Sequence, residues 1–224
     1  MTTHKVYHID GCKMLFLHPE FHENGYYNIQ ENLPKTKERV KWMPGRKDKP
    51  LAIVGYGPSL HDSWMWLSKY TDVMTMSGAH DFLIKKRIIP TYHVDADARP
   101  HKSLFTKNPH KDVQYLMASS SPVESIDRLL PYQLKLWNLE ALDMFKYPEG
   151  EMTIPPRGSV SAACVQIGYM LGYRQFAFFG CDCSFAPDGT THAGFHPNSD
   201  KQGDLIYVAV GKLVPGAGIE AYKV

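Results

Sequence analysis

Short apolar runs, separated by longer polar segments, recur along the chain between residues 51 and 179. Runs of this length, bounded by Gly, Pro, Asp and Ser, are typical of β-strands buried in a sheet. The expected strands are Leu51–Val54, Asp72–Met76, Thr91–Val94, Gln114–Ala118, Leu134–Leu139 and Gln175–Phe179.

Helical patterns fall between several of these runs. The strongest is Ser159–Leu171, where apolar residues recur at helical spacing and Gly172 follows as a C-cap. Ser59–Tyr70 and Asp81–Lys86 are expected to be further helices. Strands that alternate with helices predict an α/β, Rossmann-like fold, with a mostly parallel sheet and helices on both faces.

The ends of the chain are less regular. Residues 1–33 carry many aromatic residues and histidines with weak periodicity, which predicts an irregular cap or short strands. Residues 34–49 are rich in Lys and Arg and are expected to form a basic linker. We therefore expect an N-terminal extension with this linker, residues 1–49, and a Rossmann-like domain, residues 50–224. No element signal closes the C-terminus, so a further C-terminal segment is an open alternative.

Composition narrows the function only slightly. A formal net charge of +2 is not the signature of a general nucleic-acid-binding protein. The basic linker is either a solvated loop or a patch for a polyanionic acceptor or partner. No apolar run approaches the roughly 20 residues that span a bilayer, and the N-terminus has no signal-peptide core, so we expect a cytoplasmic protein without a membrane partner. The four cysteines form no C-x-x-C pair and are expected to be reduced residues in or near the core.

A glycine-rich turn directly follows the first predicted strand. It consists of Gly55, Tyr56, Gly57, Pro58 and Ser59. Glycine lets a ligand approach the backbone closely, and a helix that starts at the serine would present free N–H groups to an anion. The turn therefore predicts either a nucleotide-phosphate cradle or a plain βα turn. It is not the G-x-G-x-x-G fingerprint, because Leu60 stands where the third glycine would be.

Polar residues follow the other predicted strands too, at Ser77–Gly78, Asp95–Asp97, Ser119–Ser121 and Cys181–Ser184. In a parallel sheet the carboxyl ends of the strands share one edge, where ligands bind, so we expect these segments to converge.

Asp95 and Asp97 are the candidate metal ligands. In an extended segment their side chains point the same way and can reach one Mg²⁺ ion together with phosphate oxygens and waters. Arg99, His101 and Lys102 follow, and either lie in a surface loop or bind phosphate.

These motifs occur in an order that resembles a known family. The order is G-Y-G-P-S-L, I-I-P-T-Y-H-V-D-A-D, the segment from R-G-S-V-S-A-A-C to G-C-D-C-S-F, and T-H-A-G, within about residues 50–196. It resembles the MptE-like domain shared by bacterial motility accessory factors and the archaeal 6-hydroxymethylpterin diphosphokinase. It is also similar to the bacterial sialyltransferases that use CMP-sialic acid. Small stand-alone versions of this domain occur in phages, so a phage-encoded protein is one expectation.

The resemblance implies that the glycine turn packs against the nucleotide and that Ser77 and Gly78 form a second nucleotide contact. Tyr56 and Ser77 stand where the sialyltransferases tend to have Asn. The three residues that match the family's nucleotide-contacting turn at a helix start are Arg157, Gly158 and Ser159.

The resemblance also supplies candidates for the chemistry. Asp182 matches an aspartate close to the donor, and His192, with His196 second, matches the histidine that deprotonates the acceptor hydroxyl. The sialyltransferases use no metal and lack the Asp95 and Asp97 pair, which here would bind a cation or the donor sugar.

We therefore expect a nucleotide-dependent group transferase, which moves a glycosyl group from a nucleotide-activated sugar to an acceptor hydroxyl. The first alternative is a Mg²⁺-dependent diphosphokinase that uses ATP and a pterin-like alcohol. The second is a non-catalytic nucleotide- or nucleic-acid-binding module. A glycan, a metabolite or a nucleic-acid base to be modified all remain open as the acceptor. Because related sialyltransferases assemble, a homo-oligomer is an open alternative to a monomer.

Overall fold

A computed structural model describes most of the chain before residue 195. The described ranges are 6–9, 12–15, 19–140, 145–155, 159–182 and 190–194. Contacts divide the chain into two units, Met1–Gly194 and Phe195–Val224. Everything below concerns the described residues of the first unit.

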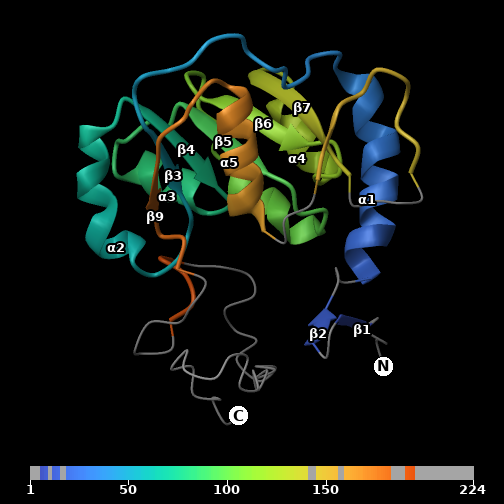
Figure 1. Cartoon of the computed structure of the whole chain (residues 1–224), viewed down its shortest axis with the longest axis horizontal. Helices are drawn as coiled ribbons and strands as arrows, with labels where there is room; N and C mark the ends of the chain where they lie inside the picture. The colour runs from blue at the N-terminus through green and yellow to red at the C-terminus, as the bar shows by residue number, and fades with distance from the viewer. Residues whose placement is uncertain are drawn as a thin grey trace. The chain divides into compact units, whose positions relative to one another are not determined.

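A seven-stranded sheet forms the centre of the first unit (Figure 1). Its strands are β3 (Leu51–Val54), β4 (Asp72–Met76), β5 (Tyr92–Asp95), β6 (Gln114–Ala118), β7 (Gln133–Leu139), β8 (Thr153–Ile154) and β9 (Phe176–Phe179). The order is β8-β7-β6-β5-β4-β3-β9, and each neighbouring pair is parallel. The chain builds the sheet outward from β3 and then returns to add β9 on the other side of β3. The strand order therefore reverses between β3 and β9, which is the position where open parallel sheets bind ligands.

Helices cover both faces of this sheet. The α-helices are α1 (Pro19–Asn32), α2 (Leu60–Ser63), α3 (Ala79–Lys85), α4 (Val123–Leu129) and α5 (Val160–Met170), and the 3-10 helices are η1 (Leu33–Lys35), η2 (Trp64–Lys69) and η3 (Pro100–Thr106). One core joins residues of α1 and α5 to one face of the sheet, and two further clusters join α2, η2, α3 and α4 to the other face. The predicted Rossmann-like α/β fold is confirmed. Separately, β1 (Val6–Ile9) and β2 (Cys12–Leu15) form an antiparallel pair.

The N-terminal part is more regular than its sequence indicates. The short strands expected in residues 1–33 are present as β1 and β2, but the α-helix Pro19–Asn32 was not predicted. Two of its inward-facing residues, Asn28 and Asn32, are polar, and this obscures the apolar periodicity. Their amides donate to backbone carbonyl groups at the carboxyl ends of β5 and β6, so the helix is held to the sheet by hydrogen bonds as well as by apolar packing.

The helix expected at Ser59–Tyr70 is also different from the prediction. Only Leu60–Ser63 is α-helical, and Trp64–Lys69 continues as a 3-10 helix. The Ser63 hydroxyl donates to the carbonyl oxygen of Ser59 at 2.8 Å. Such a bond back into the preceding turn competes with regular helix geometry and bends helices.

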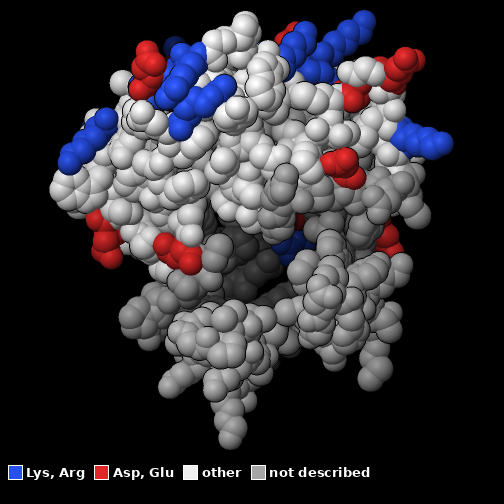
Figure 2. Space-filling view, viewed as in Figure 1, with Lys and Arg blue, Asp and Glu red and all other residues white. Residues whose placement is uncertain are grey.

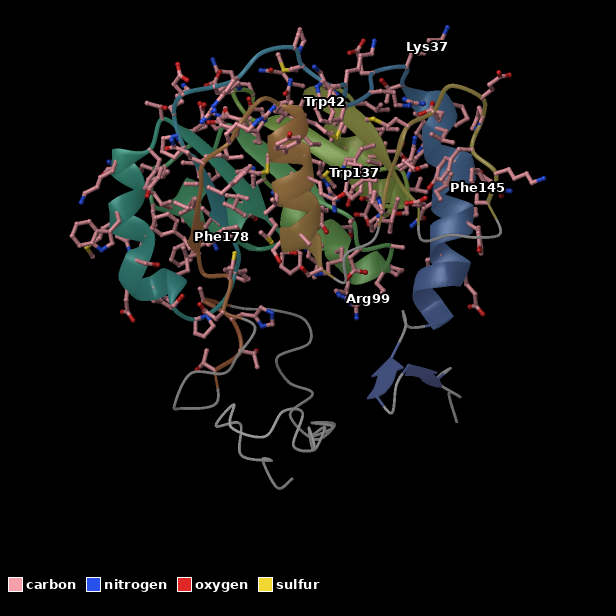
Figure 3. The ribbon with its side chains drawn as sticks, viewed as in Figure 1. Lys37, Trp42, Arg99, Trp137, Phe145 and Phe178 are labelled. Atoms are coloured by element: carbon pink, nitrogen blue, oxygen red, sulfur yellow. The ribbon has the colours of Figure 1, made fainter. Side chains whose placement is uncertain are left out.

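The basic stretch, residues 34–49, runs along the amino ends of the strands (Figure 1). It pairs with the sheet at two isolated bridges, Arg39 with Leu136 and Lys47 with Tyr173. The stretch is therefore anchored rather than free, although the domain boundary at residue 49 stays a prediction. Figure 3 shows Lys37 and Trp42 of this stretch on the upper side of the molecule and Arg99, which follows β5, on the opposite side.

Candidate functional site

The glycine turn and the end of β9 lie directly against each other at the strand-order reversal. The N–H of Gly55 donates to Phe179 O and that of Gly57 to Gly180 O, both at 2.8 Å. A Cβ atom on Gly57 would overlap the Asp182 carboxylate and Gly180 O. Gly57 is thus required by the close approach of the β9 end, and not by a positive φ. The glycines explain the tight packing without a ligand, so their role as a phosphate cradle stays a prediction.

Asp182 holds the far end of this turn. Its carboxylate accepts the backbone N–H of Ser59 at 2.8 Å and also accepts the Ser59 hydroxyl. The N–H that we expected to favour a bound anion is therefore bonded to a carboxylate of the protein itself. Asp182 lies at the predicted edge, and its observed contacts fix the turn.

Tyr56 connects the turn to three other segments. Its ring lies against Gly78, and its hydroxyl lies against Gly194. A Cβ atom added to either glycine would be 2.3 Å from Tyr56 and would overlap it. Its carbonyl accepts the N–H of Ala193 at 2.9 Å, and its ring centroid is 6.4 Å from that of Phe105 in η3. Burial and then the charge of Asp81 raise the pKa of Tyr56. The sequence identified Tyr56 only as a member of the turn, whereas the structure places it at the centre of the site.

His192 lies beside Tyr56, with 5.9 Å between ring centroids. Its Nδ1 is 2.8 Å from the Thr191 hydroxyl. Burial lowers the pKa of His192, and the positive charge of Lys102 lowers it further. The imidazole is therefore neutral at pH 7, which is the state that a general base requires. His196, Arg157 and Gly158 lie outside the described residues.

The carboxylates of the predicted metal ligands, Asp95 and Asp97, already accept other hydrogen bonds. Asp95 is 2% exposed, and its Oδ1 accepts the N–H groups of Ala96 at 2.8 Å and Asp97 at 3.3 Å. Asp97 accepts from Arg99 Nε at 3.0 Å and from Arg99 Nη2 at 2.6 Å.

The two carboxyl groups also differ in pKa. Burial raises the pKa of Asp95, although the Lys102 charge opposes this. Burial would also raise the pKa of Asp97, but the bonds from Arg99 and the charge of Lys102 outweigh it and hold that pKa below its usual value.

This arrangement fits a Mg²⁺ ion poorly. The ion would have to displace the guanidinium of Arg99, which is bonded to both carboxylate oxygens of Asp97, and it would compete with two backbone N–H groups for Oδ1 of Asp95. Within the described ranges, no group of three or more His, Cys, Asp or Glu side chains could hold a metal. Metal binding by Asp95 and Asp97 stays a prediction, and no step below depends on it.

Lys102 comes from η3 and reaches back toward the ends of β4 and β5. Its Nζ is 3.4 Å from Ser77 Oγ and 3.6 Å from Asp97 Oδ2, and it lies 5.1 Å from the centroid of the Phe105 ring. Its side chain is 9% exposed. Ser77 has a φ of 48°, which is unusual for a residue with a side chain. The sequence left Lys102 open between a surface loop and a phosphate ligand, because its burial depends on the course of η3.

The remaining predicted site residues have structural partners. Ser159 is the N-cap of α5, and its hydroxyl oxygen accepts the N–H of Ala162 at 3.3 Å. Ser119–Ser121 lie at the expected edge but are completely buried, and their carbonyl groups accept from Asn28 and Asn32. The other candidate residues described at this edge follow β9, β3, β4 and β5.

Residues 23–188 match the family described as 6-hydroxymethylpterin diphosphokinase MptE-like. The chain belongs to this family. The match begins inside α1 and ends before His192, so it does not extend to the segment that carries the candidate base.

Solved structures give a second comparison for this MptE-like chain. The MAf glycosyltransferase from Magnetospirillum magneticum AMB-1 is similar with a TM-score of 0.62 and 17% identity, over 80% of this chain and 30% of that one. This likeness shows the fold alone, and the chain spans only 30% of that protein's length. A mammalian sialyltransferase in complex with Gal-beta-1-3GalNAc-ortho-nitrophenol aligns at 10% identity with a TM-score of 0.39, over 83% of this chain and 81% of that one; at this score it carries no argument.

Curated proteins gave no match. No described helix is long and apolar enough to cross a membrane.

Proposed function

We propose that this chain transfers a glycosyl group from a nucleotide-activated sugar to an acceptor hydroxyl. The observation that carries the proposal is the position of His192, next to Tyr56 of the glycine turn, with a lowered pKa. A neutral histidine at the ligand-binding edge of a parallel sheet is suited to accept a proton from a hydroxyl. The MptE-like family and the fold shared with the MAf glycosyltransferase support a transferase that uses a nucleotide donor.

The proposed step uses His192 as the general base. The acceptor oxygen bonds to the anomeric carbon, while the bond from that carbon to the donor phosphate oxygen breaks and its electron pair stays on the phosphate. The hydroxyl proton moves to His192. When Nδ1–H donates to Thr191, Nε2 carries the lone pair that takes this proton.

Other predicted residues bind or position. In this proposal the glycine turn, Ser77 and Gly78 line the nucleotide, and Asp182 positions the turn through Ser59. Holding donor and acceptor in line supplies much of the rate acceleration.

A Mg²⁺-dependent diphosphokinase is the second candidate, favoured by the family's description. In that reaction a substrate hydroxyl bonds to the β-phosphorus of ATP, AMP leaves with the electron pair of the broken bond, and His192 takes the hydroxyl proton. The two reactions are distinguished by the nucleotide released: the nucleotide of the sugar donor in one, and AMP in the other.

The test is to incubate the protein with CMP-, UDP- and GDP-sugars, and with ATP and a pterin alcohol, each with and without Mg²⁺. Mass spectrometry then identifies the released nucleotide and the product. Release from a nucleotide sugar supports the proposal, and AMP with a diphosphorylated alcohol replaces it with the diphosphokinase. No turnover, together with no calorimetric binding of any of these nucleotides, rejects both enzymes and leaves the non-catalytic module.

A further inference from the structure

Among the described residues, the ammonium group of Lys102 makes no short hydrogen bond. An ammonium group has three N–H donors and forms charge-assisted bonds of roughly 2.7–2.9 Å. The polar contacts of Lys102 within the described part of the chain are instead Ser77 Oγ at 3.4 Å and Asp97 Oδ2 at 3.6 Å. The Lys102 side chain as a whole is only 9% exposed. A buried charge with such long contacts is costly unless a further partner binds.

The two nearby carboxylates, Asp97 and Asp95, are bonded mainly to other groups. Asp97 is bonded to Nε and Nη2 of Arg99, which are the closer and better oriented donors. Asp95 directs Oδ1 to backbone N–H groups of its own turn. Lys102 therefore forms an ion pair with Asp97 at 3.6 Å, which is longer than a charge-assisted hydrogen bond.

The residues around Lys102 also favour a binding site for a further partner. Ser77 holds its hydroxyl toward Nζ from a left-handed backbone conformation, which is strained for a residue with a side chain and tends to occur at functional sites. The Phe105 ring lies under the ammonium and packs edge-on to Tyr56. The charge of Lys102 also reaches His192, so these groups share one region of the edge.

We propose that Lys102 and Ser77 form an anion subsite for a phosphate group, which in the proposed function is the phosphate that leaves with the nucleotide. The inference rests on the proposed function for the identity of the donor. Lys102 donates a hydrogen bond to the phosphate oxygen that receives the electron pair when the glycosyl bond breaks, and it transfers no proton. Stabilising charge that develops on the leaving group is a large contribution in group transfer.

The test compares four proteins by calorimetric titration: the wild type, Lys102→Met, Lys102→Arg and the control Lys107→Met. Lys107 directly follows η3 and is exposed. The probes are cytidine, CMP, uridine, UDP and inorganic pyrophosphate. We expect CMP or UDP to bind the wild type more tightly than the parent nucleoside. The Met variant should lose about 10- to 100-fold in affinity for the nucleotide and for pyrophosphate but not for the nucleoside. The Arg variant should retain most of the affinity, and Lys107→Met all of it.

The outcomes test the anion subsite separately from the proposed function. Unchanged phosphate binding in Lys102→Met would overturn the subsite even if nucleotides bind. Pyrophosphate binding that depends on Lys102, without nucleotide binding, would keep the subsite and reject the proposed donor. If the wild type binds neither, both proposals fail.

A second variant covers the case in which Lys102→Met does not fold. Ser77→Gly removes the hydroxyl and accepts the left-handed conformation without strain. It should weaken pyrophosphate binding about 3- to 10-fold, as for the loss of one hydrogen bond to a charged group. Unchanged binding would overturn the proposal.

Discussion

The two edges of the sheet differ in how their charged groups are paired. At the amino edge, Lys49 lies 3.1 Å from Asp72, Lys47 lies 3.0 Å from the Tyr173 hydroxyl, and that hydroxyl donates to Asp72. At the carboxyl edge, the polar contacts of Lys102 in the described part of the chain are longer, 3.4 Å to Ser77 Oγ and 3.6 Å to Asp97 Oδ2. Lys47 and Lys49, which stabilise the fold at the amino edge, have close partners in the protein. Lys102, at the ligand-binding edge, has no polar partner closer than 3.4 Å among the described residues.

The same difference bears on the basic stretch. Arg39 donates Nε to both carboxylate oxygens of Glu151 at 2.9 Å, and Lys35 is paired with Asp127. These cations attach the stretch to α4 and to the segment before β8, and they are less available to a polyanion. Figure 2 shows Lys and Arg side chains along the upper margin of the visible face, where the stretch runs in Figure 1. A polyanion bound there would lie at the edge opposite the candidate site.

His192→Ala should give the largest effect. Loss of a general base lowers turnover about 10²- to 10⁴-fold, whereas the free energy of unfolding should change by less than about 1 kcal/mol, because His192 is only half-buried. The nucleotide-sugar assay and urea denaturation measure the two quantities. His110→Ala, which alters a histidine before the amino end of β6, is the matched control. A His192→Ala enzyme with wild-type turnover would remove the base from the proposal.

The same base predicts a pH profile. Because the pKa of His192 is lowered, the neutral form persists at pH 7, and activity should fall only as the pH drops below about 6.5, the ordinary pKa of histidine. Turnover measured from pH 4.5 to 8 tests this. A limb with a midpoint above 7 would contradict the assignment.

Asp72→Ala should produce the opposite pattern, a loss of stability with little effect on binding. It removes the acceptor of both Lys49 and the Tyr173 hydroxyl, and an unpaired polar group costs about 1–3 kcal/mol. Urea denaturation measures the loss, with Asp48→Ala as the control, since Asp48 is an exposed carboxylate of the basic stretch. If Asp72→Ala weakens nucleotide binding as strongly as Lys102→Met does, the contrast between the edges is wrong.

These contrasts involve residues that the sequence predicts with uneven success. Six strands of the sheet, β3 to β7 and β9, were predicted to within one residue, because each apolar run is long enough to fill one buried strand and is bounded by polar residues. The two-residue strand β8 was missed, because Thr153–Ile154 is too short to form a recognisable apolar run. The carboxyl-edge positions of Ser77, Asp97 and Asp182 follow from the predicted strands, because each residue comes directly after one, whereas His192 was chosen from the family resemblance. The sequence could not show that Asp97 is bonded to Arg99, because their pairing depends on the turn between β5 and η3.

Two kinds of residue escaped prediction for physical reasons. Asn28 and Asn32 are polar residues that face inward, so a helix that depends on them lacks the apolar stripe that identifies amphipathic helices. Lys102 belongs to a type that is almost always exposed, and only the tertiary course of η3 buries it.

His93 provides a smaller test, which concerns a buried titratable group outside the site. It is fully buried between β4 and β6, and its Nδ1 lies 3.1 Å from Thr75 Oγ1. Burial lowers the pKa of His93 well below its usual value, and His80 adds to this. The unfolded chain therefore takes up a proton below about pH 6.5 that the folded protein resists, and stability falls there by up to about 1.4 kcal/mol per pH unit.

Urea denaturation of the wild type and of His93→Gln at pH 7.5, 6 and 5 isolates this effect. The Gln variant should have a shallower decline, while His110→Ala should retain the decline of the wild type. Parallel curves for the wild type and the Gln variant would show that His93 does not contribute.

Ser77→Gly should give the smallest change in stability, but in a direction that few substitutions take. Glycine accepts a φ of 48° without strain, so the free energy of unfolding should rise by roughly 0.5–1 kcal/mol while pyrophosphate binding weakens. Thermal or urea denaturation, paired with calorimetry, gives both values. A variant that is less stable than the wild type would show that the backbone of Ser77 is not strained.

Hydrogen exchange of the wild type with and without nucleotide tests the central claim most directly. The account predicts that the nucleotide bound most tightly slows amide exchange in residues 55–59, 77–80, 99–106 and 190–194, around the carboxyl ends of β3, β4 and β5. Exchange in residues 45–50 and 172–175, at the amino edge, should not change. Protection confined to the amino edge, or no protection at a saturating nucleotide concentration, would contradict the claim that the nucleotide binds at the carboxyl edge of this sheet.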